Sequence, residues 1–129
     1  MISCKELEIL KYEYHTSTQM GRTVLAVTKD SVTVTFNGRG EPTYWARAVK
    51  AEEWKAINQS MQDVKLNEVS TLPAPSNGRA TDRSPYAKFK FVGKDSTLTS
   101  SDFDAGKPHE MLQPLMQVFN DFQSTISKD

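Results

Sequence analysis

The densest group of residues that could do chemistry lies near the C-terminal end of the chain, at positions 101–110. Within it, Asp102, Asp104 and Gly106 alternate with other residues, as the first ligands and the turn glycine do in a calcium-binding loop. A full loop would continue with further oxygen ligands and a closing glutamate. Lysine and proline follow instead, and a helical pattern begins. We therefore expect no metal ion and no other cofactor at this site.

The same aspartates suit a structural role at the entry to a helix. Aspartate oxygens commonly accept hydrogen bonds from the free amides of a first helical turn. We hypothesise a clasp in which Asp104 caps the helix entry and pairs with Arg79, which lies in a long loop that must cross near the same end of the sheet. The candidate ligand or clasp residues are Arg79, Asp82, Asp102, Asp104 and His109.

Two histidines, His15 and His109, raise the question of acid–base catalysis with Asp82 or Asp104. A pair of histidines alone is not evidence of catalysis. The sequence contains no nucleophile elbow, glycine-rich phosphate loop, HExxH helix or CxxC pair. We therefore expect that the protein is not an enzyme.

The charges of the chain balance, with 16 basic and 16 acidic residues. A general nucleic-acid binder would carry an excess of positive charge. We therefore interpret Lys88 and Lys90, beside Tyr86, as a solvated strand face, and expect no nucleic-acid partner. The 129 residues are the size of one domain, so we expect a single domain over 1–129 that is a monomer or weak dimer.

The only cysteine, Cys4, follows Met1-Ile2-Ser3. One cysteine excludes an internal disulfide. The order of these residues resembles the end of a bacterial lipoprotein signal, in which the cysteine carries the lipid. If a signal lies upstream, Cys4 anchors the protein to a membrane. The alternative is a free thiol in a frayed N-terminus.

Hydrophobic periodicity gives the order of the secondary structure. Alternating apolar and polar runs, separated by turn residues, predict strands over 6–16, 22–28, 32–36, 44–49, 88–91 and 97–103. In the third of these strands, Val32, Val34 and Phe36 are expected to enter the core. Asn37-Gly38 is typical of a tight hairpin turn between the third and fourth strands.

In two segments the apolar residues recur every three or four positions instead of every two, which predicts two helices. Trp54, Ile57 and Met61 predict the first helix, over 51–62. The second is expected over 108–125, with a kink or restart at Pro114. Its apolar stripe consists of Met111, Leu115, Val118, Phe119, Phe122 and Ile126. The order ββββαββα predicts an α+β fold: one antiparallel sheet of about six strands with both helices on one face.

Two short motifs carry a resemblance to a known family. The first runs from Ala74-Pro75 through Arg79 and Asp82 to Ala87, and the second comprises Phe103-Asp104, Gly106 and Pro108 before the last helix. In these motifs, and over most of its length, the chain resembles an uncharacterised family of small secreted or lipid-anchored proteins found widely in Bacteroidota. The departures from the family pattern are Arg83-Ser84, Ala105 and His109. The resemblance implies a lipoprotein-type signal, which would give Cys4 a purpose, and it implies no activity.

Together these features indicate a non-catalytic binding or structural domain of the bacterial cell envelope, in the periplasm or attached to the membrane. It is expected to meet a protein partner or a small ligand through a sheet face or the loop at 73–85. The alternative is a small cytoplasmic inhibitor or immunity-type protein that blocks a toxin or enzyme by shape.

Overall fold

The computed structural model describes residues 9–18, 21–38, 40, 42–62, 64, 66–71, 86–94, 96–104 and 108–126. The strands are β1 (Ile9–Thr18), β2 (Gly21–Thr28), β3 (Ser31–Gly38), β4 (Thr43–Ala48), β5 (Tyr86–Gly93), β6 (Thr97–Thr99) and β7 (Phe103–Asp104). The helices are α1 (Ala51–Gln59) and α2 (Gln113–Ile126), with 3-10 turns η1 (Leu66–Thr71) and η3 (Glu110–Leu112).

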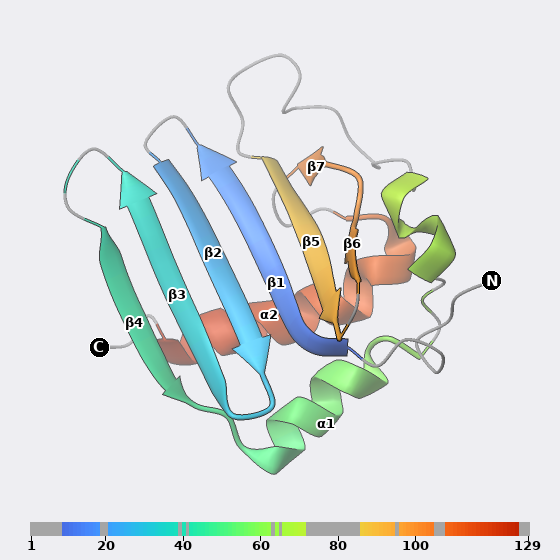
Figure 1. Ribbon diagram of the computed structural model, residues 1–129, viewed down its shortest axis with the longest axis horizontal. Helices are drawn as coiled ribbons and strands as arrows, with labels where there is room; N and C mark the ends of the chain where they lie inside the picture. Colours follow the sequence, from blue (N-terminus) through green and yellow to red (C-terminus); the bar gives the residue numbers. More distant parts are fainter. Residues whose placement is uncertain are drawn as a thin grey trace.

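All the paired strands run antiparallel in one open sheet. The order across the sheet is β4-β3-β2-β1-β5-β6, and β7 also pairs with β5. Figure 1 shows α2 crossing behind the sheet and α1 lying along its lower end. The predicted α+β fold, with one antiparallel sheet and the chain order ββββαββα, is confirmed.

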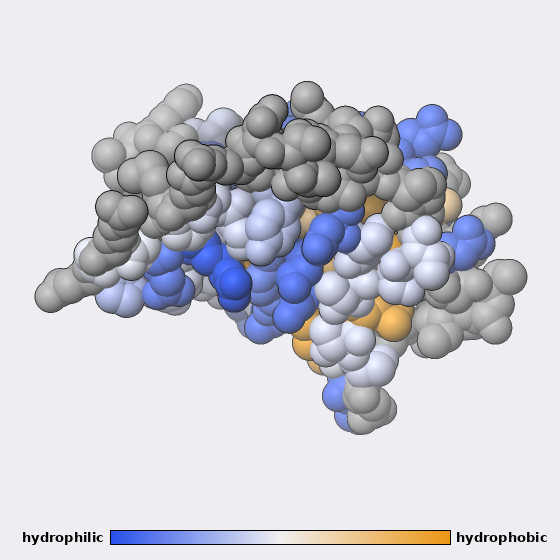
Figure 2. All heavy atoms as spheres, turned by 90° about the horizontal axis from the view of Figure 1, so that it is seen from above, coloured by the Kyte–Doolittle hydropathy of each residue, from blue (hydrophilic) through white to orange (hydrophobic). Residues whose placement is uncertain are grey.

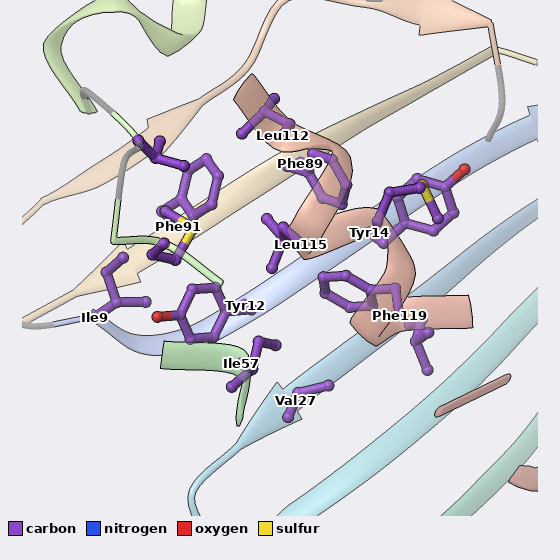
Figure 3. Close-up of a cluster of buried hydrophobic side chains, with 14 of the residues drawn as sticks. Ile9, Tyr12, Tyr14, Val27, Ile57, Phe89, Phe91, Leu112, Leu115 and Phe119 are labelled. Atoms are coloured by element: carbon purple, nitrogen blue, oxygen red, sulfur yellow. The ribbon is translucent and has the colours of Figure 1, made fainter. Parts of the chain in front are cut away.

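Aromatic rings fill the space between the sheet and α2. Register places Tyr14 of β1 beside Phe89 of β5, so their side chains share one face. The ring of Phe119, on α2, lies 5.7 Å from that of Tyr14 and 5.5 Å from that of Phe89 (Figure 3). Leu115, Phe119 and Phe122 of the predicted apolar stripe are buried, and Met111 and Val118 pack on the core. The side chain of Ile126 lies outside the described residues. Leu112 and Met116 are also buried in this core.

Helix α1 covers the same face nearer the other end of the strands. The hydroxyl of Tyr12 donates a hydrogen bond of 2.6 Å to Asn58 Oδ1, and the ring of Trp54 lies 5.7 Å from that of Tyr12. Ile57 is fully buried beside them (Figure 3). Both helices therefore cover the same side of the sheet, as the sequence predicts.

Phe36 does not enter the core, so that prediction is wrong. Val32 is fully buried and Val34 packs on the core, but Phe36 is only half-buried. It lies near the end of β3 that points away from α1, where neither helix reaches (Figure 1). The alternation of apolar and polar residues predicted the correct face for Phe36. It does not predict how far along that face the helices extend, and this extent decides whether Phe36 is buried.

The last predicted strand is divided in two by Ser100. The Ser100 side-chain oxygen accepts a hydrogen bond of 2.8 Å from Phe89 N and donates one of 3.0 Å to Ser101 O. The amide of Ser101 then donates to Val69 O at 3.0 Å. The Ser100 side chain thus takes the place of a backbone carbonyl as the acceptor for Phe89 N. The backbone amide of Ser101 is then available to hold η1 against the sheet.

Pro114 acts as a helix starter. It is the second residue of α2, where its missing amide costs no intrahelical hydrogen bond. The predicted restart at this residue is confirmed, and the segment before it forms the short turn η3. Helix α1 ends at Gln59, three residues before the predicted end at 62.

Candidate binding face

The side of the sheet opposite the helices forms a polar surface, which we call the open face. Because side chains alternate along a strand, the neighbours of the core residues on β1, β2 and β5 must point to this side. Seen from the upper edge of Figure 1, the described surface is mainly hydrophilic, with a smaller hydrophobic area (Figure 2). On the three central strands the open face carries Lys11, Glu13, His15, Ser17, Arg22, Val24, Ala26, Thr28, Tyr86, Lys88, Lys90 and Val92.

Strand register arranges these side chains in rows that cross β2, β1 and β5. Arg22, Ser17 and Tyr86 form the row nearest the end of β1. The next row is Val24, His15 and Lys88, and the one after it is Ala26, Glu13 and Lys90. Antiparallel register, which joins segments far apart in the sequence, thus gathers three basic residues around His15.

Glu13 is the carboxylate at the centre of this face. Its Oε1 lies 2.7 Å from His15 Nε2, and its Oε2 lies 2.9 Å from Lys11 Nζ. Burial raises the pKa of Glu13, but the hydrogen bonds from His15 and Lys11 outweigh burial and leave this pKa lowered. Glu13 therefore stays ionised and holds His15 in place.

His15 has a depressed pKa. Its side chain is only 17% exposed, and burial is the largest cause of the lowered value. Glu13 opposes that effect, while Lys90 and Lys88 add to it. The imidazole is consequently neutral at pH 7, and can donate or accept a hydrogen bond without charge.

A pocket of about 120 Å³ opens above His15. It is lined by His15, Ser17, Arg22, Tyr86, Ala87, Lys88 and Lys90. A second depression of about 480 Å³ adjoins it and shares Ser17, Arg22 and Tyr86. Thr18, Gly21 and Asn37 complete the lining of the second depression. The two hollows form one continuous polar site at the end of the sheet.

Of the residues singled out from the sequence, Cys4, Arg79 and Asp82 lie outside the described residues, as does the loop at 73–85. Asp102 is exposed in the segment between β6 and β7. Asp104 is buried in β7 and pairs in register with Tyr86, which in turn pairs with Ser17. The sheet therefore places Asp104 at the edge of the open face.

His109 has a structural position. Its Nδ1 accepts a hydrogen bond of 3.1 Å from Met111 N, so it caps η3 ahead of α2. Within the described ranges, no three histidine, cysteine, aspartate or glutamate side chains gather as a metal site would require. His109 thus caps the turn before α2, while the clasp between Asp104 and Arg79 stays a prediction because Arg79 lies outside the described residues.

Sequence reasoning missed Glu13 as the partner of His15 and considered only aspartates distant in the chain. The signal was present, because residues two apart on a strand share a face and Lys11, Glu13 and His15 are so spaced. The positions of the basic residues on β2 and β5, in contrast, could not be found from spacing along the chain. Only the strand order β2-β1-β5 brings Arg22 and Lys88 to opposite sides of β1.

Comparison with known proteins assigns no relationship: no family model and no curated protein matches the chain. In the part of the chain that the structure describes, no helix is long and apolar enough to cross a membrane.

Proposed function

We propose that this protein is a non-catalytic binding domain of the bacterial cell envelope that meets its ligand or partner through the open face. One observation carries the proposal. Both helices pack on one side of the sheet, while the other side presents half-buried charged side chains around a hollow. Ligand sites in proteins are concave, and a few precisely placed polar groups fix the orientation of the ligand.

The envelope location rests on the sequence. Cys4 stands in a context similar to the end of a lipoprotein signal, and the two motifs resemble a family of secreted or lipid-anchored proteins. Metabolic labelling of the full-length gene product with a fatty-acid analogue tests it. We expect label on the wild type and none on Cys4→Ser. Absence of label from both would remove the anchoring proposal.

Site-specific photo-crosslinking in living cells tests the binding role. Thr35 is on β3, and its neighbours Val34 and Phe36 point to the other face. A photoreactive residue at Thr35 is expected to give discrete adducts. The matched control is Lys55, an exposed residue of α1, which lies on the helix side of the sheet.

Adducts from position 55 with none from position 35 would contradict use of the open face. A cytoplasmic toxin or enzyme as the crosslinked partner, together with the absence of a lipid label, would replace the envelope proposal with the inhibitor alternative.

A further inference from the structure

We infer that the pocket above His15 binds a phosphate group, and that the adjoining depression holds the polar body of the small molecule that carries it. This inference deepens the proposed function and rests on it. We call the two parts the phosphate pocket (His15, Ser17, Arg22, Tyr86, Lys88, Lys90) and the body pocket (Thr18, Gly21, Asn37, with shared Ser17, Arg22 and Tyr86).

Charge is the first argument. The chain has no net charge, yet Arg22, Lys88 and Lys90 surround one small hollow. Among the described residues none of these three side chains forms an ion pair, whereas Lys11 is held by Glu13. Lys88 and Lys90 share one face of β5 and Arg22 lies across β1 from them, so these three like charges repel one another. A bound dianion would relieve this repulsion.

The register supplies the second argument. Lys88 and Lys90 lie two residues apart on β5, a Cα separation of about 6.6 Å, so both ammonium groups can reach one anion. Arg22 approaches from β2, about 9.6 Å across the sheet from β5. A phosphate above β1 would lie between these cations, over Ser17 and His15. Arginine and lysine are the usual protein partners of phosphate.

The neighbouring acidic groups leave room for the anion. Glu13 is occupied by Lys11 and His15 at 2.9 and 2.7 Å. Asp104 lies at the edge of the open face, on the far side of Tyr86 from Ser17. Among the described residues, the charged and titratable groups facing His15 are Glu13 and Lys11 on its own strand, Arg22 on β2, and Tyr86, Lys88 and Lys90 on β5, with Asp104 beyond Tyr86.

Size and polarity define the rest of the ligand. About 120 Å³ accommodates a group of a few heavy atoms, while ligand sites for whole small molecules span roughly 300–1,000 Å³. The body pocket, at about 480 Å³, is within that range. Among its described lining residues, Thr18, Asn37 and Tyr86 offer hydroxyl and amide groups, and Arg22 is the one charged residue. A phosphorylated sugar or polyol matches this combination.

The two histidines of the chain allow a direct test by NMR. His15 lies in the phosphate pocket, and His109 caps η3, so its imidazole signals serve as the internal reference. Inorganic phosphate, glucose 6-phosphate and unphosphorylated glucose are titrated at constant ionic strength. We expect saturable shifts of the His15 signals with both phosphates, a higher His15 pKa in the bound state, and no response of His109.

Matched variants separate the two parts of the site. Lys88→Met and Lys90→Met should each weaken binding of both phosphates at least tenfold. Asn37→Ala should weaken glucose 6-phosphate about fivefold and leave inorganic phosphate unchanged. Lys55→Met, on the exposed surface of α1, is the control and should bind as the wild type does. Unchanged thermal midpoints would show that the variants remain folded.

Several results would overturn the inference. These are shifts of His15 and His109 alike, no saturation with either phosphate, or equal binding by Lys88→Met. Tighter binding of oligonucleotides than of glucose 6-phosphate at the same lysines would replace the small-molecule ligand with a nucleic acid. If crosslinks from position 35 persist while phosphate binding fails, the proposed function stands and only this ligand assignment falls.

Discussion

The guanidinium of Arg47 meets the carboxylate of Glu53 in a two-pronged ion pair: Nη1 donates to Oε1 at 3.0 Å and Nη2 donates to Oε2 at 2.9 Å. Arg47 lies on β4, the edge strand, and Glu53 lies in the first turn of α1. The carbon at the centre of the Arg47 guanidinium also lies 5.5 Å from the ring centroid of Phe122 on α2. One arginine thus ties the sheet edge to both helices.

The Arg47–Glu53 pair should stabilise the fold in a pH-dependent way. Hydrogen bonds from Arg47 are the largest cause of the lowered pKa of Glu53. The ion pair therefore contributes to the free energy of unfolding above pH 4.5, the ordinary pKa of a glutamate. This contribution is lost as the pH falls through the lowered pKa of Glu53 in the folded protein.

A double-mutant cycle with Arg47→Ala and Glu53→Ala measures the coupling. The two side chains are 23% and 25% exposed, so we expect about 1 kcal/mol at pH 7 and less near pH 3. Each single substitution also removes a further hydrogen bond, from Lys50 N to Glu53 Oε1 at 2.9 Å or from Arg47 Nη1 to Ala48 O at 2.9 Å, so only the cycle isolates the pair. A coupling that is constant from pH 7 to 3 would contradict this prediction.

Phe119→Ala should destabilise the protein by about 3–5 kcal/mol, as measured by denaturant unfolding. The substitution empties a fully buried site that contacts the rings of Tyr14 and Phe89. Gln117→Ala, two residues earlier and exposed on the same helix, is the control and should change stability by less than about 0.5 kcal/mol. Equal effects of the two substitutions would show that α2 packs through another face.

Ser100→Ala should cost about 1–3 kcal/mol, because the amide of Phe89 would be left buried without its acceptor. Amide hydrogen exchange at Phe89 should accelerate more than at Phe91, which pairs with Leu98 in the regular ladder. Thr97→Ala, at an exposed position of the same edge, serves as the control. Protection of Phe89 equal to that in the wild type would mean that another group satisfies the amide.

Asp104→Ala should lower the thermal midpoint by the equivalent of about 1 kcal/mol and accelerate amide exchange in the 73–85 loop. The clasp hypothesis motivates both effects, and the burial of Asp104 in β7 supports the first. Added calcium should leave the wild-type midpoint unchanged. A calcium-dependent rise that Asp104→Ala abolishes would replace the clasp with a metal site.

Glu13→Gln should lower the pKa of His15 further, because Glu13 raises that pKa against the larger effect of burial. His15 is depressed in the folded state, so its contribution to stability is present above pH 6.5 and is lost as pH falls below it. NMR titration of the His15 imidazole measures the pKa directly, with His109 observed in the same spectra. A rise of the His15 pKa in Glu13→Gln would contradict the electrostatic account.

The sequence by itself determined which elements form and which faces they bury. The alternation in Val32–Val34 and the helical spacing of Leu115, Phe119 and Phe122 indicate which side chains are buried. Side chains return to the same face every two residues in a strand and every three or four in a helix. The tight turn predicted at Asn37-Gly38 is wrong, because both residues belong to β3 and pair with Arg22 and Gly21 of β2. The hydrophobic alternation and the helical spacing, in contrast, gave the correct faces. These are short-range properties, and a single sequence carries them.

Only the tertiary structure determined which residues from distant parts of the chain lie together on one surface. The order β2-β1-β5 places Arg22 and Lys88 on opposite sides of His15, although 66 positions separate the two basic residues in the chain. The half-burial of Phe36 and the use of the Ser100 hydroxyl in the ladder likewise depend on where the helices end and where η1 docks. Such relationships arise from strand pairing and packing between distant segments, and local periodicity holds no record of them.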